Sequence, residues 1–303
     1  MQNMLFLLRV ARRTAGYSLV EMLVVLVILL VSLGLSLAAV QKARTAAARA
    51  DCGNRQRQLA LGIHAFASVE HTLPKGCAYP QGTRPPNVAF THPGMSWHTT
   101  ILPYVDQASL YEQAVLAHRN DSYGHSSAHD SVGSNVVRLF LCPTESRQRD
   151  WVGWGVTSYL GVSGTGVMHY DGVLIPYYPV RFTDITDGTS NTVMIGERPP
   201  GVDGEFASWY AQEGGHTCYL AQLLPAGERM LIPSIAVGCK IDTPSLAPGL
   251  PENRCSVGHF WSLHPGGANF AFADGSVRFL RYPQSSILPD LATRAGGEIV
   301  AVD

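Results

Sequence analysis

The chain carries little charge and lacks the commonest catalytic motifs. Only 15% of its 303 residues are charged and the formal net charge is −1. Such a balance offers no basic surface for a phosphate backbone, which argues against nucleic acid as a partner. An H-E-x-x-H pair, a phosphate-binding loop and a dinucleotide fingerprint are absent from the sequence. Residues 161–165 miss the G-x-S-x-G pattern of serine hydrolases by one residue. We therefore expect a protein that is not an enzyme.

The cysteines also lack the C-x-x-C spacing typical of zinc ribbons and thiol redox centres. There are six of them: Cys52, Cys77, Cys142, Cys218, Cys239 and Cys255. An even number without such pairs favours disulfides formed in an oxidising compartment, with buried free thiols as the alternative. The last three lie close together in the sequence, which favours at least one local bridge. Six cysteines allow 15 connectivities, and the sequence alone does not choose among them.

Glycine (30) and proline (19) are abundant, which favours many turns and short strands. Strands are predicted at residues 136–142, 158–162, 180–185 and 192–197, and a two-part helix at 97–114. A hairpin is predicted at 269–280, because two alternating apolar runs flank Asp274-Gly275. The polar tract at 118–135 is predicted to be a solvated loop rather than a metal-binding segment. The Gly- and Pro-rich stretch at 200–258 is predicted to be a loop-rich insertion.

One long apolar run stands apart from this pattern. Residues 19–40 contain a single charged side chain, Glu21, and follow a short leader with three arginines. The run exceeds the ~20 apolar residues that cross a bilayer. Backbone groups in hydrocarbon must bond within their own segment, so the run is predicted to be helical. Apolar residues at helical spacing continue to residue 69, which extends the predicted helix over 17–70.

Two simpler explanations of this run compete. A cleaved secretory signal has an apolar region of ~7–15 residues and rarely carries an acid at its start. A plain membrane anchor explains the length but not the glycine and the glutamate at its start. Five cationic residues between 42 and 57 outnumber the leader arginines, and this count would leave the C-terminal part in the cytoplasm. The glycine and glutamate at residues 16–21 and the even number of cysteines instead favour a C-terminal part outside the cytoplasm.

Residues 16–21 read Gly-Tyr-Ser-Leu-Val-Glu and resemble the type III signal of prepilins and pseudopilins. The resemblance implies that a prepilin peptidase cuts between Gly16 and Tyr17 and leaves the helix on the mature chain. It further implies a leader at 1–16, a transmembrane and stalk helix at 17–70, and an extracytoplasmic globular domain at 71–303. Glu21 would pair with the amino terminus of a neighbouring subunit during fibre assembly. The chain would lie in a bacterial inner membrane, and on the cell surface or in a fibre after processing.

Further motifs are similar to those of a bacterial prepilin-type family known as DUF1559. They lie at residues 49–54, 59–64, 96–104, 140–143 and 184–197, and close on a His-x9-Asp-Gly element formed by His264, Asp274 and Gly275. The resemblance implies an α+β, pilin-like fold, with the long helix packed on a largely antiparallel sheet with long loops. Cys52 and Cys142 both lie in these motifs, so we expect a disulfide that ties the helix to the domain.

Several residues invite a metal or acid–base interpretation. His264 with Asp274 suggests such a pair, and Asp184, Asp187 and Asn191 offer the oxygen ligands that Ca²⁺ prefers. The spacing does not match an EF-hand, and turn stabilisation explains these side chains equally well. We expect no cofactor, with structural Ca²⁺ as the alternative.

These observations predict a structural subunit of the type IV pilin or type II secretion pseudopilin kind. Its partners would be a prepilin peptidase, the inner membrane and other pilin-like subunits, within a cell-surface fibre or a secretion apparatus. The alternative is a membrane-tethered extracytoplasmic binding or hydrolytic domain that uses a prepilin-type signal. Replacing Glu21 separates the two, because only the first needs that carboxylate for assembly.

Overall fold

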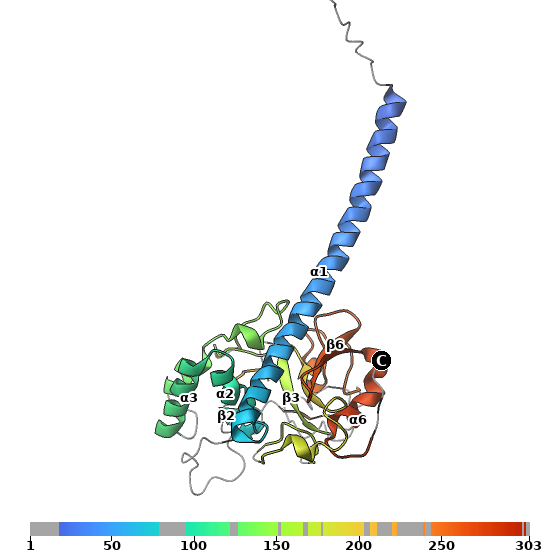
Figure 1. The fold of residues 1–303 in the computed structure, drawn as a ribbon. Helices are drawn as coiled ribbons and strands as arrows, with labels where there is room; N and C mark the ends of the chain where they lie inside the picture. The colour runs from blue at the N-terminus through green and yellow to red at the C-terminus, as the bar shows by residue number, and fades with distance from the viewer. Residues whose placement is uncertain are drawn as a thin grey trace, which may run out of the picture. The chain divides into compact units, whose positions relative to one another are not determined.

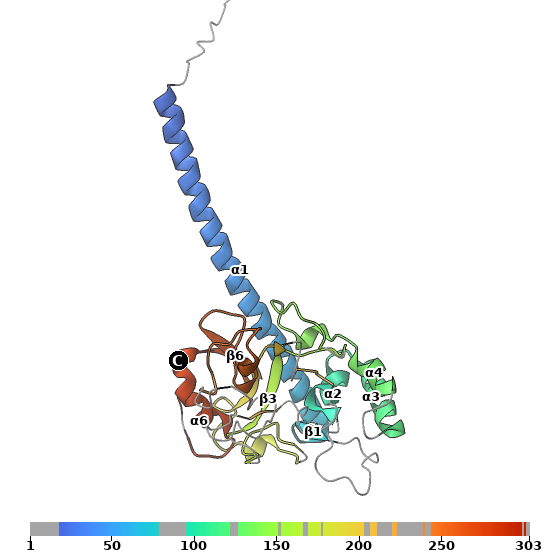
Figure 2. The same ribbon diagram turned by 180° about the vertical axis from the view of Figure 1, so that it is seen from behind.

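The structure is a computed structural model. It describes residues 18–78, 95–121, 127–150, 153–165, 169–176, 178–202, 207–210, 220–222, 239, 244–298 and 300. The chain divides into two compact units, Met1–Ala47 and Ala48–Asp303. The second unit is called the head below, and Figures 1 and 2 show it from opposite sides. The head begins within the predicted helix rather than after residue 70.

Helix α1 spans Leu19–Glu70, close to the predicted 17–70. Within residues 19–40, every large apolar side chain is exposed, by 46% to 79%. Among the residues that the structure describes, α1 is the one helix long and apolar enough to cross a membrane. No proline interrupts it, and Gly34 faces open space, so nothing in this stretch breaks the backbone ladder. The apolar part of α1 therefore has no protein core of its own.

The part of α1 that belongs to the head has a buried side. Its buried residues are Cys52, Gln56, Leu59, Ala60, Gly62, Ile63 and Ala67, at the spacing of one helical face. This face contributes to a core cluster with α2 (Trp97–Ile101) and strand β3 (Tyr159–Gly164). Burial of this face, rather than helix propensity, fixes the second half of α1 in the head.

The sheet has five strands in the order β5-β3-β4-β6-β7. Strands β3, β4 (Val193–Glu197), β6 (Gly267–Phe272) and β7 (Val277–Arg281) pair antiparallel, and β5 (Leu220–Gln222) joins β3 in parallel at the edge. The predicted hairpin is β6–β7, with Ala271 opposite Val277 and Gly275 at φ +84° in the turn. Only glycine adopts such an angle without strain, which is why Asp-Gly marks the turn.

Alternation along the strands places two apolar layers on the two faces of the sheet. Tyr159 points into the cluster that includes Cys52 and Ile63, whereas its neighbour Leu160 belongs to a second cluster. That second cluster includes Phe260, Phe270 and the short helix α6 (Leu288–Ala292). The head is therefore built in layers, with the second half of α1 on one face of the sheet and α6 on the other.

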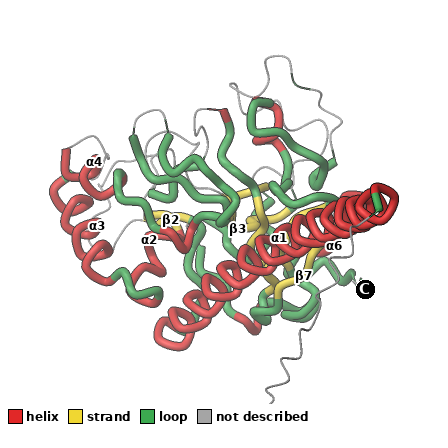
Figure 3. Tube along the Cα trace, turned by 90° about the horizontal axis from the view of Figure 1, so that it is seen from above, coloured by secondary structure: helices red, strands yellow, loops and turns green. Residues whose placement is uncertain are grey.

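The remaining elements cover the ends of these layers. Strands β1 (Cys77–Ala78) and β2 (Met95–Ser96) form a two-stranded ladder. The two-part helix predicted at 97–114 is present as α2, the 3₁₀ turn η1 (Leu102–Tyr104) and α3 (Ala108–Asn120). Helices α2, α3 and α4 (Ser127–Gly133) gather at one end of the head in Figure 3.

Three of the sequence-based predictions are wrong. Residues 136–142 and 180–185 form the 3₁₀ turns η2 (Arg138–Phe140) and η3 (Phe182–Asp184), not strands. Some of their apolar side chains, Val137, Phe140 and Ile185 among them, are buried in the core without being part of a strand. In the described part of the tract at 118–135, residues 118–120 end α3 and residues 127–133 form α4, and His118 and His129 are buried against Tyr210. Most of the stretch at 200–258 lies outside the described residues. Its described parts include β5 and the 3₁₀ helix η6 (Arg254–Gly258).

Candidate functional site

The first candidate site is the start of α1. Gly16 and Tyr17 lie outside the described residues. Glu21 stands in the first turn, and its Oε2 accepts a hydrogen bond from the backbone N–H of Ser18 at 2.8 Å. The first N–H groups of a helix lack partners within the helix. A carboxylate at this end can accept from them and also interacts favourably with the positive end of the helix dipole. Glu21 thus caps the helix in the unprocessed chain.

The second candidate site is a buried cluster of four side chains, Cys52, Cys142, Glu197 and His264. Their potential ligand atoms all lie within 4.8 Å of one another. Each residue comes from a different segment: α1, the loop after η2, the end of β4 and the loop before β6. None of the four residues is exposed by more than 4%. The fold therefore brings together four positions that are far apart in the sequence.

The two sulfurs of this cluster are joined. Cys52 and Cys142 form a disulfide with a Cα–Cα distance of 5.0 Å, the pair expected from the sequence motifs. The Tyr159 hydroxyl donates to the Cys52 carbonyl at 3.3 Å, and the Cys142 N–H donates to Ser158 Oγ at 3.1 Å. These contacts hold both ends of the disulfide against strand β3 and the residue that precedes it.

Glu197 and His264 lie beside the disulfide. One carboxylate oxygen of Glu197, Oε2, accepts the backbone N–H of Asn269 at 2.6 Å. The other, Oε1, is buried without a hydrogen-bond partner and lies 3.7 Å from Nε2 of His264. The same Nε2 lies 3.4 Å from Sγ of Cys142. His264 is held in place by its backbone N–H, which donates to Ser262 Oγ at 2.9 Å.

Burial sets the protonation of this pair. It raises the pKa of Glu197 from 4.5 to about 7, although the hydrogen bonds from Asn269 oppose the shift. It also lowers the pKa of His264, and the nearby Arg49 guanidinium lowers that pKa further. His264 is therefore a neutral imidazole at neutral pH. The 3.7 Å approach between the two side chains is a polar contact rather than an ion pair.

His264 and Asp274 are not brought together. Strand β6 separates them, with His264 before its first residue and Asp274 after its last. Asp274 Oδ1 accepts the Ser276 N–H at 2.8 Å, and the Asp274 N–H donates to the Thr189 carbonyl at 2.9 Å. Asp274 is thus part of the hairpin turn, and the partner of His264 is Glu197.

The oxygen ligands proposed for Ca²⁺ are used in turns. Asp187 accepts the N–H groups of Gly296 at 2.7 Å and Gly297 at 2.9 Å, which fixes the C-terminal loop. Asp184 accepts the Arg181 N–H at 2.8 Å, and the Asn191 side chain donates to the Asp187 carbonyl at 3.2 Å. Within the described ranges, the only group of three or more His, Cys, Asp or Glu able to hold a metal is the buried cluster.

A second disulfide joins Cys239 and Cys255, with a Cα–Cα distance of 5.4 Å. This is a local bridge of the kind that the sequence favoured. Cys218 and the side chain of Cys77 lie outside what the structure describes.

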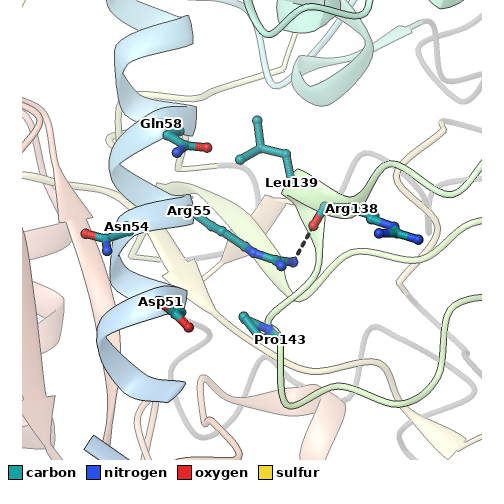
Figure 4. Close-up of a pocket in the computed structure, with 7 residues that line it drawn as sticks. All are labelled: Asp51, Asn54, Arg55, Gln58, Arg138, Leu139 and Pro143. Carbon is teal, nitrogen blue, oxygen red and sulfur yellow. Dashed lines mark hydrogen bonds between the residues drawn. The ribbon is translucent and has the colours of Figure 1, made fainter. Parts of the chain in front are cut away.

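A surface pocket of about 490 Å³ lies on the head beside α1. Figure 4 shows its lining residues: Asp51, Asn54, Arg55 and Gln58 of α1, with Arg138, Leu139 and Pro143 opposite. The Arg55 guanidinium donates to the carbonyls of Arg138 and Leu141. Arg55 therefore ties α1 to the segment that carries Cys142, a role that the sequence pattern did not reveal.

Sequence reasoning did not connect Glu197 and His264 with the cysteines. The available signal was that all four residues lie in or beside the family-like motifs. Motif membership indicates which positions matter but not which of them are neighbours.

An exposed apolar helix with one carboxylate in its first turn, followed by an α+β head, is the arrangement of a pilin-like exported protein. Residues 11–37 match the prokaryotic N-terminal methylation motif, which implies processing by a prepilin peptidase and association with the membrane. Residues 41–284 match the family described as protein of unknown function (DUF1559), and the chain belongs to that family. No curated protein and no solved structure matches the chain.

Proposed function

We propose that the chain is a non-enzymatic, pilin-like structural subunit that is cut between Gly16 and Tyr17. The mature chain then assembles through its N-terminal helix into a cell-surface fibre or a secretion apparatus. The observation that carries the proposal is the exposure of every large apolar side chain in residues 19–40. An apolar surface of this extent is unfavourable in water. Lipid would cover it before assembly, and neighbouring helices would cover it afterwards.

Glu21 supports assembly rather than anchoring alone. A charged residue inside a bilayer costs roughly 2.5–3.5 kcal/mol at the centre, so a pure anchor gains nothing from it. After cleavage, Tyr17 would carry a new amino group about one turn from Glu21. A cation from a neighbouring chain at this depth would offset the cost of burying the carboxylate. Such a pair would also fix the register of adjacent subunits.

The head would serve this role as a folded, disulfide-braced body. The buried cluster of Cys52, Cys142, Glu197 and His264 has its two sulfurs in a disulfide and no residue exposed by more than 4%. A substrate would need a large opening of the core to reach it. We therefore propose no catalytic role for the head, and no cofactor in it while the Cys52–Cys142 disulfide is closed.

A second function is favoured by one observation, the pocket beside Arg55. The pocket opens to solvent and is lined by both polar and apolar side chains, which could hold a small ligand in a membrane-tethered binding domain. Such a binder would use the N-terminal helix only as an anchor. Its activity would not depend on the carboxylate of Glu21.

The variant Glu21→Ala separates the two functions. The assembly proposal predicts a chain that is processed and held in the membrane but absent from sheared surface material and from cross-linked ladders. Glu70→Ala is the matched control, because it removes an exposed carboxylate from the other end of α1. A Glu21→Ala chain that cross-links and performs its cellular role like the wild type would exclude the assembly function and favour the tethered binder.

A further inference from the structure

The buried cluster contains an unusual polar atom. Oε1 of Glu197 has no hydrogen-bond partner although the residue is 1% exposed. Leaving a buried acceptor unpaired costs roughly 1–3 kcal/mol, and more for a charged group. The potential ligand atoms nearby are Nε2 of His264 and the two sulfurs of the disulfide. Oε1 of Glu197 therefore shares a buried site with an imidazole nitrogen and two sulfurs, all of which are atoms that can bind a metal.

The spacing of these atoms fits a small tetrahedral metal. Nε2 of His264 lies 3.4 Å from Cys142 Sγ and 3.7 Å from Glu197 Oε1. Zinc bonds of about 2.0–2.3 Å in a tetrahedron place the ligand atoms about 3.3–3.8 Å from one another. The two sulfurs, which are now bonded, would have to separate, and any other pair of these atoms, all within 4.8 Å of one another, would close to the same spacing.

We propose that reduction of the Cys52–Cys142 disulfide converts the cluster into a zinc site. Its ligands would be the two cysteine sulfurs, Nε2 of His264 and Oε1 of Glu197. Two thiolates, an imidazole and a carboxylate form a ligand set that favours Zn²⁺ over Mg²⁺ or Ca²⁺. This inference does not depend on filament assembly, since it concerns the head alone.

The chemistry proceeds in two balanced steps. A dithiol reductant gives two electrons and two protons to the disulfide, which becomes two thiols while the dithiol becomes a cyclic disulfide. Zn²⁺ then displaces one proton from each thiol and binds the two thiolates, releasing two protons to solvent. In the reverse direction a disulfide oxidant takes two electrons from the thiolates and two protons from solvent to become a dithiol, the Cys52–Cys142 bond re-forms, and Zn²⁺ is released. The site is therefore closed to zinc in the oxidised chain and open in the reduced one.

The surroundings support a metal in this position. The Asn269 N–H fixes Oε2 of Glu197 at 2.6 Å and leaves Oε1 directed at the cluster. Thr144 Oγ1 lies 2.9 Å from Cys142 Sγ, where it can donate to a thiolate. Outer contacts of this kind orient metal ligands and tune their basicity. The complex would carry one net negative charge, which the nearby Arg49 guanidinium offsets.

The test uses the full chain in detergent micelles, titrated with Zn²⁺ in its oxidised form and after reduction by a phosphine. The phosphine takes its oxygen from water, and the two protons of that water pass to the sulfurs. We expect one tightly bound Zn²⁺ in the reduced chain that the oxidised chain lacks. Co²⁺ in place of Zn²⁺ should show the absorption of a tetrahedral ion with thiolate ligands.

Matched variants separate this site from the other cysteines. Cys239→Ser/Cys255→Ser should keep the tight site, whereas Cys52→Ser/Cys142→Ser should lose it. His264→Ala and Glu197→Gln keep the disulfide, so their oxidised forms report folding independently. Each should weaken zinc binding by more than the roughly 10–100-fold that the loss of an outer-shell contact costs.

Two results would overturn the proposal. One is a reduced wild type that binds zinc no more tightly than the Cys52→Ser/Cys142→Ser chain. The other is a reduced chain that unfolds and that Zn²⁺ does not refold.

Discussion

The two described disulfides allow a prediction with a magnitude. The bond between Cys52 and Cys142 closes a loop with a sequence separation of 90, and that between Cys239 and Cys255 closes one of 16. A crosslink removes conformational entropy from the unfolded chain, and the amount grows with the logarithm of loop length. The longer loop should therefore contribute more to the stability of the head.

The chain-entropy relation gives about 4.6 kcal/mol for the longer loop and about 3.1 kcal/mol for the shorter one. For a unit of this size, each kcal/mol shifts the midpoint of thermal unfolding by about 2 °C. The double variant Cys52→Ala/Cys142→Ala should therefore lower Tm by about 9 °C, and Cys239→Ala/Cys255→Ala by about 6 °C. The first variant also leaves Glu197 and His264 without their packing partner, which adds to the loss.

The measurement is thermal unfolding of both oxidised double variants and the wild type in the same micelles, followed by circular dichroism. Urea unfolding checks that the free energies of unfolding follow the same order. Equal losses, or a larger loss for the Cys239–Cys255 pair, would refute the reasoning from loop length. It would also mean that the bridge between α1 and the 142 segment does not brace the head.

Three other predictions follow. The pKa of Glu197 in the folded head is about 7, above its ordinary 4.5, so the folded state binds more protons between these values and loses stability as pH rises through them. This contribution changes the free energy of unfolding by up to about 1.4 kcal/mol per pH unit, and Glu197→Gln should remove it. Urea unfolding of both chains at pH 5 and pH 8 measures the effect, and an unchanged pH dependence in the variant would contradict the assignment to Glu197. Gly267→Ala should cost about 1–3 kcal/mol in urea unfolding, because a Cβ there meets the Leu280 carbonyl on the next strand. Gly53→Ala has room and is the control, and equal stability of the two variants would contradict the packing argument. Gly16→Ala should leave the leader on the chain, seen as the mass of the precursor, and a normally trimmed variant would contradict cleavage at this position.

Much of the fold could be predicted from local patterns. The unbroken apolar run predicted the first half of the long helix. The helical spacing of Leu59, Ile63 and Phe66 predicted that the helix continues into the head. Alternation on both sides of Asp274-Gly275 identified the β6–β7 hairpin, because the turn needs a glycine at positive φ. These elements are specified by neighbours in the sequence.

Other elements depended on contacts that no local pattern carries. The apolar stretches at 136–142 and 180–185 look like strands, but each contains a 3₁₀ turn, and their buried side chains join the core cluster without strand pairing. The described part of the polar tract at 118–135 contains two helical segments, and its buried His129 bonds to the Tyr210 hydroxyl at 2.7 Å, a partner 81 residues away. Tertiary contacts decided the structure in both cases.

The candidate sites differ in the same way. Gly16 and Glu21 are read from one contiguous motif, so the sequence alone proposed them. The buried cluster needs four segments to meet, and its members include a strand end and two loops. His264 was paired with Asp274 because they share a motif, whereas the strand between them keeps them apart. Spacing along an extended strand separates residues that a motif presents together.

The most direct test of the central claim is the intact mass of the protein isolated from its native membrane. A chain that is trimmed at its leader and keeps its apolar helix should begin at Tyr17, with the added mass of one methyl group if its new amino terminus is methylated. Mature molecules that begin at Met1, or near Ala39 with the helix removed, would contradict the account.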